Sequence, residues 1–314
     1  MKLQHIFEVE NTCPCDQNRS ATRLYLVLIL FTCLPLIGTT VRAAETGEFL
    51  EPLLAHSVLI LMSPAQNMEA AGTGFYCTTT QRIFLVTAKH VLFGKDPAST
   101  NLIAREATLI SYGKGTNSEL KATNVVALDE LWRRGAIRPS MTNDVAVIAL
   151  GERGPGPAPS WVRYESGVTN RTPNLPIFGF DIEEMTVRFG EIRAGSEAYI
   201  VGFPRSLGQA KLSPSSVDPD RPLFRRGIIA GKNPKSFNLV VDAPVYQGNS
   251  GGPLILNLHA PGGVEVLRIA GVVTKFVGFE RVLTDNRDQG LVVEIVNSGY
   301  AIAVPMDPVL DLLW

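Results

Sequence analysis

The sequence has no excess of charge of either sign and lacks the common motifs of metal and nucleotide chemistry. Lys and Arg number 29 and Asp and Glu number 30, so the formal net charge of the 314-residue chain at pH 7 is −1. This balance provides no electrostatic attraction to nucleic acid or to an anionic membrane surface, and we predict no nucleic-acid partner. No H-E-x-x-H motif, paired-cysteine knuckle or Walker A loop occurs, so we predict no metal and no other cofactor.

Cysteine is also scarce, and three of the four cysteines lie in the first 33 residues. In the same region, Arg19 and Arg23 precede an apolar run over residues 24–37, and Val41 and Ala43 follow it as small residues. This is the pattern of an export signal, although an apolar stretch extended over residues 24–41 is also compatible with an uncleaved membrane anchor. We predict that residues 1–43 are an export signal or membrane anchor that directs the protein to the periplasm or the cell exterior.

Cleavage after Ala43 would leave Cys77 as the only cysteine of the mature chain. No intramolecular disulfide could then form, and the stability of the fold would have to come from packing. No residue near Cys77 in the sequence suggests a partner for a reactive thiol. We therefore predict that Cys77 is a small buried hydrophobic residue.

Long periodic helices are missing, and short β-branched and apolar runs broken by Gly, Pro, Asn and Asp fill the chain beyond residue 45. This pattern predicts an all-β domain over residues 44–314 and argues against an α/β doubly wound fold. Glycine and proline concentrate at residues 151–160, which separates a first β unit at about 50–150 from a second at about 190–305, with a connection over 151–189. The segment MDPVLDLLW predicts a short C-terminal helix over residues 307–314.

The segment APVYQGNSGGPLIL, residues 243–256, places Ser250 among three glycines. A serine hydroxyl becomes an effective nucleophile when a general base takes its proton and a third group orients that base. His90 directly follows an apolar strand in FLVTAKHVLF, and Asp144 directly precedes one in TNDVAVIAL, so rigid elements would hold both side chains. Taken singly, these residues have simpler explanations: a glycine-rich hairpin, a core histidine and a turn residue. Taken together, they predict a His-Asp-Ser triad in a cleft between the two β units.

The sequence GNSGG also fits the G-x-S-x-G elbow of α/β hydrolases. That family places an acid and then a histidine after the serine. The only histidine after Ser250 is His259, nine residues later in the printed sequence, and the long helices of that fold are missing. The order of residues therefore excludes an α/β-hydrolase esterase.

Four segments, GTGF, TAKHV, NDVAVI and GNSGGP, resemble in this order the chymotrypsin-like, trypsin-fold serine peptidases. The stretches VVDAPVYQGNSGGPL and YAIAVP are most similar to the bacterial HtrA and glutamyl-endopeptidase branch. We expect a stand-alone protease domain without a PDZ domain, because the 64 residues after Ser250 are too few to complete the barrel and add one. The resemblance implies two antiparallel six-stranded β-barrels with a short C-terminal helix. It further implies a serine endopeptidase that forms an acyl-enzyme and acts on peptide or protein substrates.

The resemblance also assigns roles to individual residues. Ser250 would attack the scissile carbonyl, His90 would act as general base and then general acid, and Asp144 would orient His90. The backbone N–H groups of Gly248 and Ser250 would form the oxyanion hole, and Gly251 and Gly252 would allow close packing behind the nucleophile. By analogy, the substrate-binding residues would be Thr274, Lys275 and Phe276, which pair with the substrate backbone, and Pro244, near the base of the primary pocket.

Two positions depart from the family pattern. Asn249 stands where the digestive enzymes carry the Asp that pairs with a newly freed N-terminal amine, so this mode of activation should be missing and the oxyanion hole must form by other means. Lys89 places a long cation beside His90, and we expect its ammonium group to reach solvent. The alternative to a peptidase is a catalytically silent, protease-like domain that binds peptides or partners without cutting them.

Overall fold

The computed structural model describes residues 50–62, 70–113, 121–154, 162–173, 175, 177–204, 218, 221–260, 262–284 and 291–313. All of them belong to the unit Ala44–Trp314. The predicted export signal or anchor, residues 1–43, lies outside the described residues. Within the described ranges, no helix has both the length and the apolar character needed to cross a membrane.

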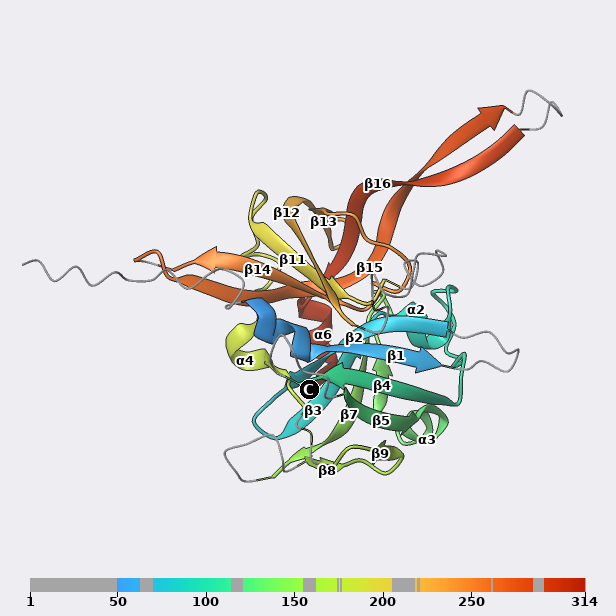
Figure 1. Ribbon diagram of the computed structural model, residues 1–314, viewed down its shortest axis with the longest axis vertical. Coiled ribbons are helices and arrows are strands. Elements are labelled where there is room, and N and C mark those ends of the chain that lie inside the picture. Colours follow the sequence, from blue (N-terminus) through green and yellow to red (C-terminus); the bar gives the residue numbers. More distant parts are fainter. Residues whose placement is uncertain are drawn as a thin grey trace, which may run out of the picture. The chain divides into compact units, whose positions relative to one another are not determined.

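The first half of this unit is a curled sheet of ten strands (Figure 1). Its path runs β6-β7-β3-β2-β1-β4-β5-β9, with β8 paired to β7 and β10 paired in parallel to β2. The strands are β1 (Ser57–Met62), β2 (Ala70–Thr78), β3 (Arg82–Thr87), β4 (Glu106–Tyr112), β5 (Lys121–Ala127), β6 (Ile137–Pro139), β7 (Ala146–Arg153), β8 (Val162–Tyr164), β9 (Val168–Asn170) and β10 (Phe180–Asp181). The short helices of this half are η1 (Glu51–His56), α2 (Lys89–Phe93), α3 (Leu128–Arg133) and α4 (Ile182–Met185).

The second half is a closed barrel of six antiparallel strands in the order β11-β12-β13-β16-β15-β14. Its strands are β11 (Glu197–Gly202), β12 (Leu223–Asn233), β13 (Asn238–Asp242), β14 (Pro253–His259), β15 (Glu265–Thr284) and β16 (Leu291–Pro305), and helix α6 (Asp307–Leu313) follows. The predicted all-β double barrel with a C-terminal helix is thus confirmed. The first sheet differs from the expected six strands because the short strands β6, β8, β9 and β10 extend it.

The connection over residues 151–189 contains three of these additional strands and helix α4. Strands β8 and β9 have only three residues each, and β10 has two. Segments this short cannot show a period-2 alternation of apolar and polar residues, so the sequence pattern predicted an irregular connection. In the structure their backbone groups pair with β7, β5 and β2, which extends the first sheet.

Strand β3 is buried on both faces, which explains its continuous apolar sequence. Leu85 packs inside the first sheet, whereas Phe84 and Val86 face a second cluster that includes Val201 of the second barrel and Val309 of α6. Each fully buried side chain of this size contributes about 1.5–3 kcal/mol of transfer free energy. The two barrels and α6 therefore share one apolar interface. His90 follows shortly after the end of β3, so this buried strand fixes its position.

Cys77 lies in β2 and is fully buried, as expected from the sequence. Burial, with a smaller contribution from the nearby Asp181 carboxylate, raises the pKa of the Cys77 thiol, so the thiol stays protonated at neutral pH. We expect maleimide to leave Cys77 unmodified in the native full-length chain and to alkylate it after unfolding in guanidinium. Peptide mapping by mass spectrometry measures both states, and rapid native alkylation of Cys77 would contradict this burial.

Candidate active site

His90 and Asp144 come from separate segments of the first half and contact each other directly. His90 lies in α2, immediately after the buried strand β3, and Asp144 lies two residues before β7. The His90 N–H donates to Asp144 Oδ1 at 2.9 Å, and His90 Nδ1 lies 2.7 Å from Asp144 Oδ2. Both carboxylate oxygens of Asp144 thus bind His90. This fixes the imidazole ring and favours the proton on Nδ1.

Ser250 sits on the turn between the segment after β13 and strand β14. Its carbonyl accepts the N–H of Thr73 at 2.9 Å, which ties this turn to β2 of the first sheet. A Cβ atom on Gly251 would overlap the Thr73 carbonyl and approach the N–H of Ala88, which directly precedes α2. The close packing expected for Gly251 is therefore confirmed, and it brings the serine turn against the segment that carries His90.

The Ser250 hydroxyl donates to the carbonyl of Thr274 at 3.0 Å rather than to His90. Catalytic hydrogen bonds are often loose or misaligned without substrate and form in the complex. The geometry therefore places a half-buried serine, a carboxylate-oriented imidazole and an alternative acceptor for the serine proton within one site.

The backbone N–H groups of the serine turn divide into used and unused donors. Three N–H groups are used at 2.7–3.0 Å: that of Asn249 donates to the Tyr246 carbonyl, that of Gly251 to the Val273 carbonyl, and that of Gly252 to the Asn249 carbonyl. Within the part of the chain that the structure describes, the N–H groups of Gly248 and Ser250 have no acceptor. Buried backbone N–H groups are rarely left without an acceptor, and these two, in buried Gly248 and half-buried Ser250, are available for an incoming oxygen atom.

Asn249 holds the turn that precedes Ser250 with both its backbone and its side chain. Residues Tyr246 to Asn249 form a turn closed by the Asn249 N–H to Tyr246 C=O bond, and Gly248 has φ +96° at the third position, as type II turns require. The side-chain Oδ1 of buried Asn249 accepts the Tyr246 N–H at 3.2 Å and closes the turn a second time. The backbone and the side chain of Asn249 thus both hold the turn that leads to Ser250.

Thr73 is a positioning residue that the sequence reasoning quoted within GTGF but did not single out. It is fully buried in β2, and its hydroxyl donates to the Gly248 carbonyl at 2.5 Å and accepts the Phe203 N–H at 3.0 Å. Its N–H holds the Ser250 carbonyl, and its own carbonyl accepts the Thr87 hydroxyl at 2.7 Å. Thr73 thus clamps the carbonyls on both sides of Asn249. A polar residue inside a buried strand was the available signal.

Removal of the Thr73 hydroxyl should loosen this clamp. In Thr73→Val the buried Gly248 carbonyl loses its partner, a change worth about 1–3 kcal/mol, so we expect kcat of a peptide substrate to fall about 10- to 100-fold with KM little changed. Thr73→Ser should restore kcat because it restores the donor. The control is Thr79→Val, which removes a buried hydroxyl at the β2–β3 turn. Equal loss of kcat in both valine variants would show a general loss of stability instead.

The residues predicted to bind substrate are not equally close to the serine. Thr274 is buried in β15 and contacts Ser250 through its carbonyl, and the exposed Lys275 and half-buried Phe276 follow it on the same strand. Pro244 is exposed in the segment between β13 and the serine turn. The structure therefore places Thr274 against the nucleophile, whereas within the described residues no hydrogen bond joins Lys275, Phe276 or Pro244 to Ser250.

Lys89 does not follow the sequence expectation. Its side chain is only 5% exposed, and Nζ donates to the carbonyl of Pro97 at 2.7 Å instead of reaching solvent. The loop after α2 folds back over the side chain and supplies this acceptor, a contact between segments that the sequence pattern does not show. The ammonium group binds this loop and not the His90 imidazole, whose partner is Asp144.

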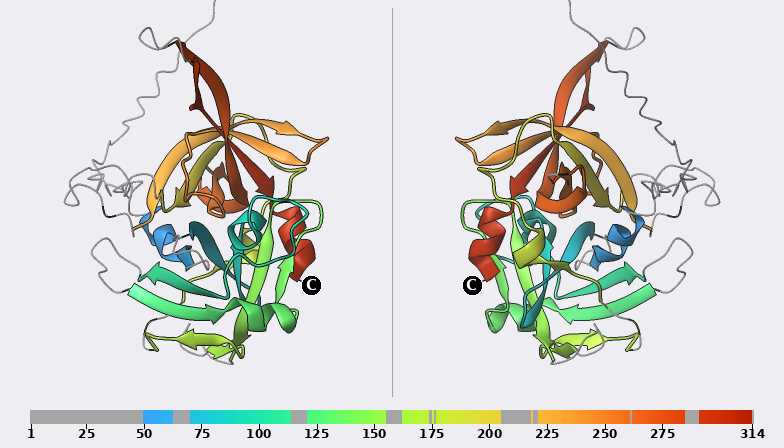
Figure 2. Two further views of the ribbon diagram at one scale, coloured as in Figure 1. Left: turned by 90° about the vertical axis from the view of Figure 1, so that its right-hand side faces the viewer. Right: turned by 90° about the vertical axis from the view of Figure 1, so that its left-hand side faces the viewer.

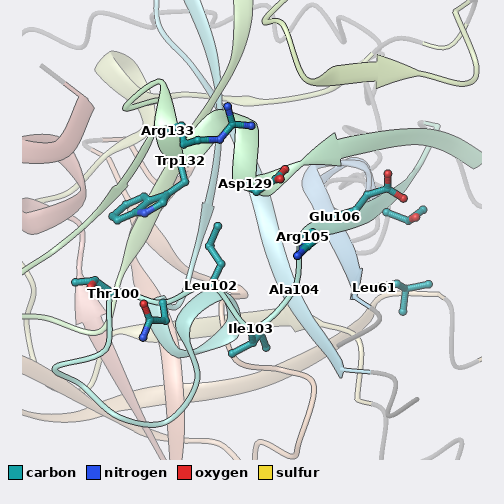
Figure 3. A pocket seen from close by; sticks show the side chains of 12 residues that line it. Leu61, Thr100, Leu102, Ile103, Ala104, Arg105, Glu106, Asp129, Trp132 and Arg133 are labelled. Atoms are coloured by element: carbon teal, nitrogen blue, oxygen red, sulfur yellow. The ribbon is translucent and has the colours of Figure 1, made fainter. Parts of the chain in front are cut away.

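A hollow of about 970 Å³ lies elsewhere, over β4, α3 and the connection before β4 (Figure 3). Leu102, Arg105, Asp129, Trp132 and Arg133 are among its lining residues. His90, Asp144 and Ser250 are not among its lining residues. The site is thus defined by hydrogen bonds and packing and not by this hollow.

The comparison with protein families agrees with this geometry. Residues 72–259 match the family model described as the trypsin-like peptidase domain, a span that includes His90, Asp144 and Ser250. The chain belongs to the trypsin-like peptidase family. The resemblance stated from the motifs is thereby confirmed. Among curated proteins, none matches this peptidase domain.

Solved structures similar to the peptidase domain include three proteases. The HtrA-type protease AlgW, solved with a tripeptide, is 15% identical, with a TM-score of 0.46. The match covers 86% of this chain and 62% of that protein. A serine endoprotease from Yersinia pestis is 15% identical, with a TM-score of 0.44 and coverage of 65% of its length by 86% of this chain. Protease Anisep from Arthrobacter nicotinovorans is 14% identical, with a TM-score of 0.43 and coverage of 90% of its length by 80% of this chain. The peptidase domain thus spans less than two thirds of the first two.

Proposed function

We propose that this protein is a serine endopeptidase that hydrolyses peptide bonds through His90, Asp144 and Ser250. The observation that carries the proposal is the combination of an imidazole held by both oxygens of Asp144 with two unused N–H groups beside Ser250. Such a pair of donors has a chemical use where negative charge develops on a carbonyl oxygen. A purely structural glycine turn would not need it.

In the proposed mechanism, substrate binding redirects the Ser250 hydroxyl from the Thr274 carbonyl to His90 Nε2. Ser250 Oγ then attacks the scissile carbonyl while His90 takes the hydroxyl proton, and Asp144 stabilises the imidazolium through Nδ1–H. The N–H groups of Gly248 and Ser250 receive the oxyanion. His90 next gives its proton to the leaving amine, which leaves an acyl-enzyme on Ser250. Water, activated by His90, releases the second product.

Substrate recognition in this proposal uses the start of the exposed part of β15. The backbone of Thr274, Lys275 and Phe276 would pair with the residues before the scissile bond, because the Ser250–Thr274 bond places this strand next to the nucleophile. Pro244 stays a candidate for the primary pocket from the family resemblance alone. We further propose that residues 44–314 act as one peptidase domain, exported by residues 1–43 or held at a membrane by residues 24–41.

A peptide-library cleavage assay tests the proposed function. The full-length chain should cleave a mixed peptide library and leave products whose new ends mass spectrometry identifies, and Ser250→Ala should yield no products. If wild type and Ser250→Ala both bind peptides and neither cleaves them, the protein is the silent peptide-binding domain. The hydrogen bond from Ser250 to Thr274 instead of His90 is the observation that favours this second candidate.

A further inference from the structure

Strands β15 and β16 continue as a two-stranded ribbon beyond the second barrel. β15 has 20 residues and β16 has 15, whereas strands of globular proteins usually have 3–10. The β15–β16 ribbon consists of Gly278–Thr284 paired with Leu291–Asn297. Figures 1 and 2 show it extending away from the barrel. Among the described residues, no third strand pairs with it.

One face of the β15–β16 ribbon carries three exposed apolar side chains beside Glu280. Directly opposite residues of an antiparallel pair share a face, so the pairs Val282–Val293 and Glu280–Ile295 lie on the same face. Val282, Val293 and Ile295 are 58%, 57% and 67% exposed. An isolated two-stranded ribbon is marginally stable in water, and contiguous exposed apolar surface marks a binding site. The ribbon thus has the properties of a surface that another chain covers.

The open edge of β15 begins at the nucleophile. On the side of β14, the last strand pair of β15 is Pro253–Val272. The next residue, Val273, pairs with Gly251 and Gly252 of the serine turn, and the carbonyl of Thr274 accepts the Ser250 hydroxyl. From there to Thr284, no described strand occupies this edge, and the edge contains no proline that would block strand addition.

The base of the ribbon is also fixed to the catalytic region. Asn297 Nδ2 donates to the carbonyl of Val245, which belongs to the segment that leads into the serine turn, at 2.6 Å. The Ser298 hydroxyl donates to the carbonyl of Val277 at 2.6 Å, at the bulge where the register of β15 shifts between Phe276 and Gly278. These bonds hold the start of the ribbon beside the active site, so the two surfaces are continuous.

The proposed mechanism determines which part of a substrate chain lies along the open edge of β15. His90, from the first sheet, protonates the leaving amine, so the chain after the scissile bond lies toward the first sheet. The acyl part lies on the side of the Gly248 and Ser250 donors and of Thr274. At about 3.3 Å per residue, the edge from Thr274 to Thr284 accommodates about ten residues of an extended chain.

We propose that the β15–β16 ribbon binds the polypeptide segment on the N-terminal side of the scissile bond, as an added strand with apolar side chains at alternate positions. This inference rests on the proposed function for its direction and extends it by a substrate class: unfolded, apolar chains. A folded protein does not offer about ten extended residues with free backbone groups, whereas an unfolded one does. Backbone pairing supplies affinity, and the face of Val282, Val293 and Ile295 selects apolar residues.

Binding to the full-length Ser250→Ala variant tests the inference without any need for turnover. One fluorescent core peptide is extended by ten residues of alternating Val and Thr at its N-terminus, by the same ten at its C-terminus, or by ten Gly and Ser at its N-terminus. We expect fluorescence anisotropy to show at least tenfold tighter binding for the first peptide only. An added strand uses only every second backbone N–H group. N-methylation of the nitrogens that face β15 should therefore abolish the gain, whereas N-methylation of the intervening nitrogens should preserve it.

Ribbon variants locate the effect. Val282→Thr, Val293→Thr and Ile295→Thr combined should lower the ratio of long-peptide to short-peptide affinity about threefold or more, because they remove the apolar contacts and keep the backbone edge. The matched control is Val264→Thr, which changes a valine that is 61% exposed in the turn between β14 and β15 and should keep the full ratio. Equal gains from N- and C-terminal extensions, or a full ratio in the triple variant, would overturn the inference.

Two further outcomes separate the inference from its alternatives. If sedimentation shows self-association that the triple variant loses, with no gain from peptide extension, the ribbon is a contact between copies of this chain and the inference is overturned. If wild type cleaves the library but extension changes no affinity, the inference fails and the proposed function stands. If extension strengthens binding while wild type cleaves nothing, the ribbon surface is supported and the proposed peptidase activity fails.

Discussion

Ser250→Ala should lower the turnover of a peptide substrate by about 10⁶-fold, the scale expected when a working triad loses its nucleophile. Without Oγ no acyl-enzyme can form, and His90 has no hydroxyl proton to take. The fold should survive, because the hydrogen bond lost is the one from the half-buried hydroxyl to Thr274, while the Ser250 carbonyl keeps its bond to Thr73. Steady-state kinetics measures the loss, and thermal unfolding checks the fold.

Ser166→Ala is the matched control for this substitution. The Ser166 hydroxyl donates to Glu130 on the surface of the first sheet and belongs to no part of the proposed site. Its turnover should equal that of wild type. If Ser250→Ala retained more than about one hundredth of wild-type turnover with unchanged product ends, another nucleophile would have to carry the reaction, against the expected scale of loss.

Asp144→Asn should lower kcat by about 10⁴-fold, the loss typical of a triad whose histidine is held in the wrong tautomer. The two Asp144 oxygens now accept from the His90 N–H and from Nδ1. An amide offers one oxygen and one NH₂ group in their place, so it donates to Nδ1 or leaves the backbone N–H without an acceptor. The imidazole proton then moves to Nε2, where it prevents acceptance of the serine proton.

The measurement for Asp144→Asn is kcat and KM at several pH values, with Asp311→Asn on the exposed side of α6 as the control that removes the same charge. A loss confined to kcat in Asp144→Asn alone supports the orienting role. Activity of Asp144→Asn within tenfold of wild type would show that His90 does not depend on this carboxylate.

The sequence motifs predicted the positions that now meet in space, but not the bonds that hold them. His90 and Asp144 could be paired in advance because each stands at the end of a buried strand. The contacts of Thr73 with Gly248 and Ser250 join residues in different barrels, and neither local propensity nor periodicity reports such a contact. Lys89 was wrongly expected in solvent for the same reason, because its acceptor belongs to a loop that returns over it.

Strand lengths were less predictable than strand positions. The sequence indicated separate strands at LVVEIV and at YAIAVP. In the structure the two runs form one strand, β16, because both pair with β15 despite shifts in register. The same pairing creates a ribbon with exposed Val282 and Ile295, which a sequence pattern would place in a core. Apolar residues that the fold leaves uncovered are visible only in the structure, and here they motivate the proposed binding of substrate to the ribbon.

The central claim is that folding makes Ser250 a nucleophile. Treatment of the native full-length chain with a fluorophosphonate, followed by peptide mapping, measures this directly. We predict one phosphonyl group on Ser250 in native wild type, much slower labelling in Asp144→Asn, and no label on Ser250 in protein unfolded before treatment. A native chain whose Ser250 stays unlabelled, or is labelled equally fast after unfolding, would contradict the account.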